Sequence, residues 1–479
     1  MRTPVKSWDS HWIDGRWVQG SGAIEVTDSH TEEVIATVPE GTAAEVDLAV
    51  DAARRAFPAW SATPTKERAA ILQAVADGMH ERQTELATLI SREVGTPFML
   101  ANLVQTGLPN VSFSSMAELL DGWEPDSRQG NSIITREPVG VVAAITPWNY
   151  PLHQIAAKIA PALAAGCTVV LKPSEVAPLN AFVLMEILDA AAVPAGVVNL
   201  VCGTGPVVGE ALAAHPGVDM ITFTGSTAAG RRVAAVAART VKKVALELGG
   251  KSPLVVLPDA DMGNAVLRSL TGCFINSGQT CSALTRLVVP ASRAAEVEEL
   301  AGGFAAFATV GDPFDPAHQL GPLVSALQRD RVRAHISRAL DEGARLLAGG
   351  VEPPHESGFY VQPTVLGGVT RDMAVAQEEV FGPVLVVQSY DDSGTEQEQD
   401  DAAVAVANDT VYGLAAGVFG GDPERALRVA RRIRAGQVEV NGGAFNPVAP
   451  FGGYRQSGVG RELGSFGFEE YLEVKAIQL

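Results

Sequence analysis

A cysteine in a short polar loop is the residue of this sequence best suited to chemistry. Cys281 lies in the run FINSGQTCSALTR, residues 274 to 286, where glycine allows close backbone approach and the following LTRLVV is typical of an anchoring strand. A thiolate is a strong nucleophile, but a thiol with an ordinary pKa of about 8.5 needs neighbouring dipoles or charges to ionise at neutral pH. The pattern predicts a presented thiol whose activation depends on other parts of the chain.

A glutamate upstream of this loop is the candidate general base. Glu247 lies in LELGGKSP, residues 246 to 253, inside an apolar strand that breaks at Gly249 and Gly250. Burial among apolar neighbours raises the pKa of a carboxyl group and suits it to accept a proton near neutral pH. Taken singly, the cysteine fits a small core residue and the glutamate a solvated charge. Their combination favours a catalytic pair.

These two segments resemble the signatures of the NAD(P)-dependent aldehyde dehydrogenase superfamily, a glutamate in an E-L-G-G-K-S-P pattern followed by a cysteine in an F-x-N-x-G-Q-x-C pattern. The resemblance extends from about residue 12 to the C-terminus. It implies attack of Cys281 on an aldehyde, hydride transfer to NAD, and hydrolysis of the thioester by water that Glu247 activates. It also implies that Asn149, in TPWNYP, holds the oxyanion with the Cys281 backbone N–H. Ordinary turn chemistry is the alternative for Asn149.

Composition and charge limit the classes of function. The chain has 479 residues, 47% of them hydrophobic, which predicts two or three globular domains. A net charge of −19 repels phosphate backbones and anionic lipid, so neither nucleic-acid nor membrane binding is expected. The four cysteines form no CxxC pair and have no nearby histidine cluster, which favours a reducing compartment without disulfides or a metal site. The N-terminus lacks a signal-peptide core, so we expect a cytoplasmic protein.

From Val139 onward, apolar β-branched runs alternate with helical stretches, which predicts a parallel, doubly wound α/β sheet with a dinucleotide site. The resemblance implies a Rossmann-type cofactor domain (residues 1–118 and 139–249) and an α/β catalytic domain (residues 250–456). A small β oligomerisation arm would comprise residues 119–138 and 457–479 and form a homodimer or homotetramer. An ordinary edge hairpin is the alternative for that arm.

Nearer the N-terminus the patterns predict packing elements without chemistry. Asp14-Gly15 is typical of a hairpin turn. A capping box at Thr42 predicts a helix that stops at Pro58, and a further helical pattern runs from Pro64 to Gly95.

The best phosphate cradle is FTGSTAAG, residues 223 to 230, at a strand end and a helix start. Gly225, Ser226 and Gly230 match the family motif, although Ser226 also fits a simple helix cap. The run GTGPVVG, residues 203 to 209, has the wrong glycine spacing and a proline, so we interpret it as a turn. Lys172 and Glu175 suit the adenosine ribose, and the Glu175 carboxylate should repel a 2′-phosphate and favour NAD over NADP. The other cofactor residues implied by the resemblance are Ile145, Trp148, Ser174, Leu248, Glu379 and Phe381.

The substrate follows less directly from the sequence. The resemblance assigns the tunnel to Tyr150, Gln154, Ile275, Thr280, Ser282 and Phe445. No arginine or lysine is among them, which favours hydrophobic aliphatic or aromatic aldehydes over semialdehydes that carry a carboxylate.

Three alternative functions stay open. A CoA-acylating family member would not need the water-activating Glu247. A cofactor-free cysteine hydrolase would need a histidine base, and His153 fits a helix entry better. A non-catalytic binding protein would be expected to lose Cys281, Glu247 or Asn149. NADH formation with a panel of aldehydes separates the hydrolase and the binding protein from an aldehyde dehydrogenase.

Overall fold

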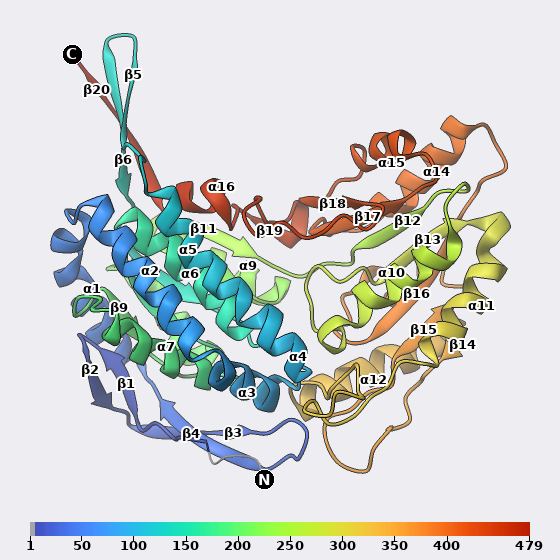
Figure 1. Cartoon of the computed structure of the whole chain (residues 1–479), viewed down its shortest axis with the longest axis horizontal. Helices are drawn as coiled ribbons and strands as arrows, with labels where there is room; N and C mark the ends of the chain where they lie inside the picture. The colour runs from blue at the N-terminus through green and yellow to red at the C-terminus, as the bar shows by residue number, and fades with distance from the viewer. Residues whose placement is uncertain (1–4) are drawn as a thin grey trace.

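The computed structural model describes residues 5–479, which form two helix-covered sheets at opposite ends of the long axis (Figure 1). The first sheet has eight strands in the order β19-β11-β10-β7-β8-β9-β1-β2. Neighbours from β11 to β9 are parallel, whereas β19, β1 and β2 join antiparallel at the edges. The strands are β1 (Ser10–Ile13), β2 (Arg16–Gln19), β7 (Val141–Ile145), β8 (Thr168–Lys172), β9 (Val198–Leu200), β10 (Met220–Thr224), β11 (Lys243–Glu247) and β19 (Gly458–Val459).

Central strands of this sheet are buried on both faces, as the apolar runs predict. Val142 and Ala144 point into one core and Val141 and Ala143 into another, because successive side chains of a strand alternate. The first core is covered by α2 (Thr65–Glu81), α3 (Gln83–Val94), α5 (Gly107–Leu119), α6 (Pro151–Ala165) and α7 (Leu179–Ala190). The second is covered by α1 (Ala43–Ser61), α8 (Glu210–Ala214) and α9 (Thr227–Ala237).

The second sheet has seven strands in the order β14-β15-β16-β13-β12-β17-β18. They are β12 (Pro253–Val256), β13 (Arg286–Pro290), β14 (Arg345–Ala348), β15 (Thr364–Gly367), β16 (Val384–Tyr390), β17 (Ala415–Phe419) and β18 (Gln437–Val440). The helices that pack on it are α10 (Met262–Phe274), α11 (Ala294–Ala305), α12 (Ala326–Asp341), α13 (Ala374–Gln377), α14 (Glu396–Asn408) and α15 (Pro423–Ala430). The predicted α/β architecture is therefore present in both halves.

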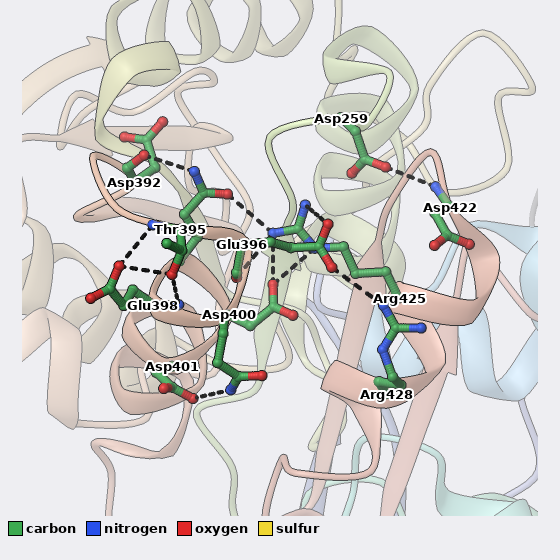
Figure 2. Close-up of polar contacts among 12 residues, drawn as sticks. Asp259, Asp392, Thr395, Glu396, Glu398, Asp400, Asp401, Asp422, Arg425 and Arg428 are labelled. Atoms are coloured by element: carbon green, nitrogen blue, oxygen red, sulfur yellow. Dashed lines mark hydrogen bonds and ion pairs between the residues drawn. The ribbon is translucent and has the colours of Figure 1, made fainter.

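A buried ion pair joins α14 to α15 on the outer side of the second sheet (Figure 2). Arg425 Nη2 lies 2.7 Å from Asp400 Oδ1, and both side chains are more than nine-tenths buried. Asp422 caps α15, and its backbone N–H donates to Asp259 Oδ2 at 2.8 Å. These contacts fix the two helices relative to β12 and β17.

A three-stranded arm projects from the molecule at the upper left of Figure 1. Its strands β5 (Asp126–Gln129), β6 (Ser132–Pro138) and β20 (Leu472–Gln478) lie in the order β20-β6-β5. Ile133 pairs with Ile477, so the two segments that were expected to form the arm lie in one sheet. A separate hairpin consists of β3 (Gly22–Thr27) and β4 (Val34–Glu40).

Local predictions in the first half are partly wrong. The Asp14-Gly15 turn and the Thr42 capping box are confirmed. However, α1 continues through Pro58 to Ser61, so the one hydrogen bond lost with the missing Pro58 N–H does not end the helix.

The run at residues 203 to 209 is not a simple turn. Gly205–Gly209 forms a π-helical turn that leads into α8, with proline at its start. Proline is tolerated there because the first helical N–H groups have no intrahelical partner.

Candidate active site

Asn149 lies between β7 and α6 and is almost fully buried. Its side-chain Nδ2 donates to the backbone oxygen of Gln279 at 3.0 Å. Its backbone oxygen accepts from Asn276 Nδ2 at 2.9 Å and from Gln105 Nε2 at 3.3 Å. Because Nδ2 carries two hydrogens, the bond to Gln279 leaves the other hydrogen for a further acceptor.

The residues that precede Cys281, here named the cysteine loop (residues 275–281), connect α10 to the segment before β13. Asn276, Ser277 and Gly278 have φ values of 52°, 56° and 74°, all in the left-handed region. A Cβ on Gly278 would lie 2.1 Å from the oxygen of Gly382, so only glycine fits there. The loop turns sharply and leaves Cys281 half-buried.

The surroundings of Cys281 oppose its ionisation. Burial first, and then the carboxylates of Glu379 and Glu247, raise the pKa of Cys281 to about 12. A backbone hydrogen bond from Ser282 acts in the opposite direction. In this state the thiol keeps its proton at neutral pH, so forming the thiolate requires a change in its burial, in these charges, or in both.

Glu247 ends β11 with 5% of its surface exposed. Neither carboxylate oxygen has a hydrogen-bond partner among residues 5–479. Burial, followed by the nearby Glu462 carboxylate, raises the pKa of Glu247 well above its usual value. The expected buried carboxyl group is thus present.

Sequence reasoning missed two charged residues beside Glu247. Lys158, fully buried in α6, donates to Thr224 Oγ1 at 2.6 Å and contacts the Glu462 carboxylate. The signal for Lys158 is in the sequence, because it is the one charged residue of the apolar helix PLHQIAAKIAPALAA. Nothing local identifies Glu462.

A cavity of about 240 Å³ lies between the strand ends of the first sheet and α12. Eight of the predicted site residues line it: Trp148, Asn149, Gly225, Ser226, Leu248, Cys281, Glu379 and Phe381. It does not reach Ile145, Lys172, Ser174, Glu175, Gly230 or Glu247. It is also lined by Gln328, Arg331 and His335 of α12. These three residues lie in an ordinary polar helix, so nothing in the local sequence marks them as site residues.

The floor of this cavity is formed by the start of α9 and the end of β11. Ser226 caps α9, with its Oγ accepting from Ala229 N at 3.3 Å. Gly230 faces Leu248, and a Cβ there would lie 2.4 Å from Leu248 Cδ2. Glycine at position 230 therefore allows α9 to approach the strand closely.

Aromatic and acidic groups form the other wall. Trp148 and Phe381 pack edge to face with ring centroids 5.3 Å apart. Glu379 Oε1 accepts from Gly250 N at 2.9 Å, and burial raises the pKa of Glu379 to about 7.

The predicted ribose pair lies at the end of β8. Lys172 Nζ donates to Glu175 Oε2 at 2.6 Å, and Ser174 Oγ accepts from Val176 N at 3.3 Å. The Glu175 side chain is about one-third exposed, whereas Lys172 is almost buried. Glu175 is therefore the member of the pair that a ligand can contact.

The predicted substrate residues are brought together only in part. Tyr150 Oη lies 3.0 Å from Thr280 Oγ1, which donates to the Ile275 backbone oxygen at 3.4 Å. Gln154 is 6% exposed, with its Oε1 unpartnered among residues 5–479. Ser282 follows Cys281 directly, while Phe445 lies half-exposed in the loop after β18, its ring centroid 6.4 Å from that of Phe451.

A family model described as the aldehyde dehydrogenase family matches residues 17–477. The chain belongs to the aldehyde dehydrogenase family. One similar curated protein is the 3-succinoylsemialdehyde-pyridine dehydrogenase of Pseudomonas sp., 46% identical over 483 residues that cover 99% of each chain. The aldehyde dehydrogenase fold and enzyme class follow for this chain.

Solved structures show the same fold. A mutant of aldehyde dehydrogenase C from Pseudomonas syringae, in complex with NAD+ and octanal, superposes with a TM-score of 0.96 at 50% identity, covering 98% of this chain and 96% of the other. Betaine aldehyde dehydrogenase from Staphylococcus aureus, in complex with NAD+, gives a TM-score of 0.93 at 37% identity, covering 98% and 94%. Among residues 5–479, no helix is long and apolar enough to cross a membrane.

Proposed function

We propose that this aldehyde dehydrogenase oxidises an aldehyde to the carboxylic acid with NAD, using Cys281 as nucleophile, Glu247 as general base and Asn149 as oxyanion donor. One observation carries the proposal. A single cavity is lined by Cys281 and Asn149 together with Gly225 and the aromatic residues Trp148 and Phe381 of the expected cofactor site. The NAD+ found in the two solved relatives supports this choice of cofactor.

The residues present fit NAD. The start of α9 offers backbone N–H groups for a pyrophosphate, and Gly225 leaves room beside them. When bound, NAD would accept the hydride from the former aldehyde carbon, which would convert the thiohemiacetal on Cys281 into a thioester. The residues proposed to hold it are Ile145, Trp148, Lys172, Ser174, Glu175, Gly225, Ser226, Gly230, Leu248, Glu379 and Phe381. The Glu175 carboxylate disfavours the 2′-phosphate of NADP.

In the proposed reaction, Cys281 Sγ bonds to the carbonyl carbon of the aldehyde. Its thiol must first lose a proton, because burial raises the pKa of Cys281 to about 12. Glu247 is suited to accept that proton because burial raises its own pKa. The free amide hydrogen of Asn149 then donates to the oxyanion, and losing such a donor costs about 100- to 1,000-fold in rate. Glu247 must be deprotonated again before it activates the water that hydrolyses the thioester.

For the substrate we propose hydrophobic aliphatic or aromatic aldehydes. Tyr150, Gln154, Ile275, Thr280, Ser282 and Phe445 would line the tunnel without a cationic side chain to bind a carboxylate. The octanal complex of the Pseudomonas syringae relative supports this class. The pyridine semialdehyde in another relative's name is an uncharged aromatic example.

We further propose a cofactor domain (residues 1–118 and 139–249), a catalytic domain (residues 250–456) and an oligomerisation arm (residues 119–138 and 457–479) in a homodimer or homotetramer. The pairing of β6 with β20 supports the arm. All four cysteines are free thiols, which supports a reducing, cytoplasmic setting.

The deciding experiment measures NADH formation by the purified protein with hexanal, octanal, benzaldehyde and succinic semialdehyde. We expect turnover with NAD+ in the absence of CoA, a higher kcat/KM for the first three aldehydes, and a lower kcat/KM when NADP+ replaces NAD+. The Cys281→Ser variant should lose about 1,000-fold or more in kcat, because an alcohol is a far weaker nucleophile than a thiolate. No NADH with any aldehyde would refute the proposed function. Strict CoA dependence would favour the acyl-transferring alternative, for which Glu247 has no role.

A further inference from the structure

The cysteine loop holds a backbone conformation that its own residues do not favour. Asn276 and Ser277, with φ of 52° and 56°, are consecutive non-glycine residues in the left-handed region. Asparagine tolerates that region better than most residues, whereas serine, like other residues with a Cβ, adopts it at a cost because the Cβ crowds the following carbonyl oxygen. Two such residues in succession persist only where the surrounding structure holds them.

A threonine outside the loop supplies part of that support. Thr96 follows α3 and the left-handed Gly95, and it is fully buried. Its hydroxyl donates to Asn276 Oδ1 at 2.6 Å. The amide of Asn276 in turn donates from Nδ2 to the Asn149 backbone oxygen at 2.9 Å. Thr96 therefore fixes the side chain that ties the loop to the proposed oxyanion donor.

A glutamine completes this arrangement. Gln105 is fully buried at the end of a π-helical turn, Ala101–Gln105. Its Nε2 donates to Thr96 Oγ1 at 2.9 Å and to the Asn149 backbone oxygen at 3.3 Å. The hydroxyl of Thr96 thus accepts one hydrogen bond and donates another, which fixes its direction. π-Helical turns are rare and frequently occur at functional sites.

We propose that Thr96 and Gln105 are positioning residues that hold the cysteine loop and Asn149 in register, so that the Cys281 thiol and the Asn149 amide meet the same carbonyl group. The inference rests on the proposed roles of Cys281 and Asn149. The segment that follows α3, for which the sequence predicts only a packing role, would thus have a role in catalysis.

The test compares Thr96→Val, which removes the hydroxyl at nearly constant shape, with Thr96→Ser, which keeps it. Thr88→Val is the control, because Thr88 lies in α3 shortly before Thr96 and its hydroxyl bonds only the backbone oxygen of Thr84 within that helix. We expect kcat to fall about tenfold or more in Thr96→Val, because the buried Asn276 and Gln105 groups lose their partner. The Kd for NAD+ should stay within about twofold, and Thr96→Ser and Thr88→Val should stay near wild type.

A second readout needs no turnover. In the cofactor-free protein, iodoacetamide should alkylate Cys281 about fivefold faster in Thr96→Val than in wild type, because a loosened loop exposes more of the half-buried thiol. Wild-type protein that makes no NADH with any aldehyde would refute the proposed function, whereas the alkylation rates would still test the positioning role.

Three outcomes would overturn the inference. The first is a Thr96→Val protein with wild-type kcat and alkylation rate. The second is an equal loss of kcat in Thr96→Ser, since the hydroxyl would then not be the cause. Should Thr96→Val fail to fold, Gln105→Met tests the same network, with the same directions expected. Failure of both to fold would also overturn it, since the pair would then serve stability alone.

Discussion

At the scale of single residues, the site combines a thiol with several buried carboxyl groups. Glu379 is the leading charged contributor to the raised pKa of Cys281, and Glu247 is the next. The same carboxyl groups have raised pKa values of their own because they are buried. Thiol reactivity should therefore depend on pH through the carboxyl groups as well as through the thiol itself.

The Glu379→Gln substitution tests this dependence. Removing a negative charge should lower the pKa of Cys281 and speed its alkylation by iodoacetamide in cofactor-free protein. A fall of about one pH unit in that pKa would give about tenfold at fixed pH. The pKa of Glu379 is about 7, so wild type and variant should differ above pH 7 and converge below it, where Glu379 is already protonated.

Glu378→Gln is the control, because this neighbouring carboxylate is half-exposed and pairs with Arg338. It should leave the alkylation profile close to that of wild type. A Glu379→Gln alkylation profile that coincides with that of wild type at every pH would show that the Glu379 carboxylate does not raise the pKa of Cys281.

At the scale of helices and strands, the ion pair between α14 and α15 provides a test of stability (Figure 2). Arg425→Met leaves the buried Asp400 carboxylate without its partner and should lower the free energy of unfolding by about 3 kcal/mol. Arg428→Met is the matched control, since Arg428 is half-exposed and its 3.4 Å contact with Glu396 should contribute under about 1 kcal/mol. Urea denaturation measures the free energy of unfolding of both variants. An equal loss in the two would show that the buried pair stabilises the protein no more than the exposed pair does.

The sequence predicts an element well where the residues that cause it are neighbours in the chain. Apolar β-branched runs identify β7, β8 and β10, because burial on both faces leaves a continuous pattern. The proximity of Cys281 and Asn149 could be predicted only through the family resemblance. The bond from Thr96 to Asn276, 180 residues apart, has no local signature. The raised pKa of Cys281 likewise depends on carboxylates from distant segments.

At the scale of the whole molecule, the projecting arm leaves apolar side chains uncovered. Val474 is 67% exposed and Ile477 43% exposed on β20. Uncovered apolar residues on a strand at a sheet edge favour association with another chain.

Replacing both Val474 and Ile477 by lysine should therefore reduce the assembly to a smaller species, measured as molar mass by light scattering. Leu346→Lys is the control, because Leu346 is similarly exposed on β14, away from the arm. An unchanged mass in the double variant, or a wild-type protein that is already monomeric, would exclude this role for the arm.

The strand β19 has a consequence for how the protein forms during synthesis. Residues 458 and 459 pair with Glu247 and Leu246 and so complete the first sheet, more than two hundred positions after its neighbour β11 has been made. The backbone oxygen of Ser457 also accepts a hydrogen bond from Leu248 N, and the Ser457 hydroxyl donates to the backbone oxygen of Gly249 at 2.7 Å. A nascent chain still attached to the ribosome therefore lacks this border of the sheet until residues 458 and 459 have left the exit tunnel, and chaperone protection of the incomplete amino-terminal half is expected to matter most in that interval.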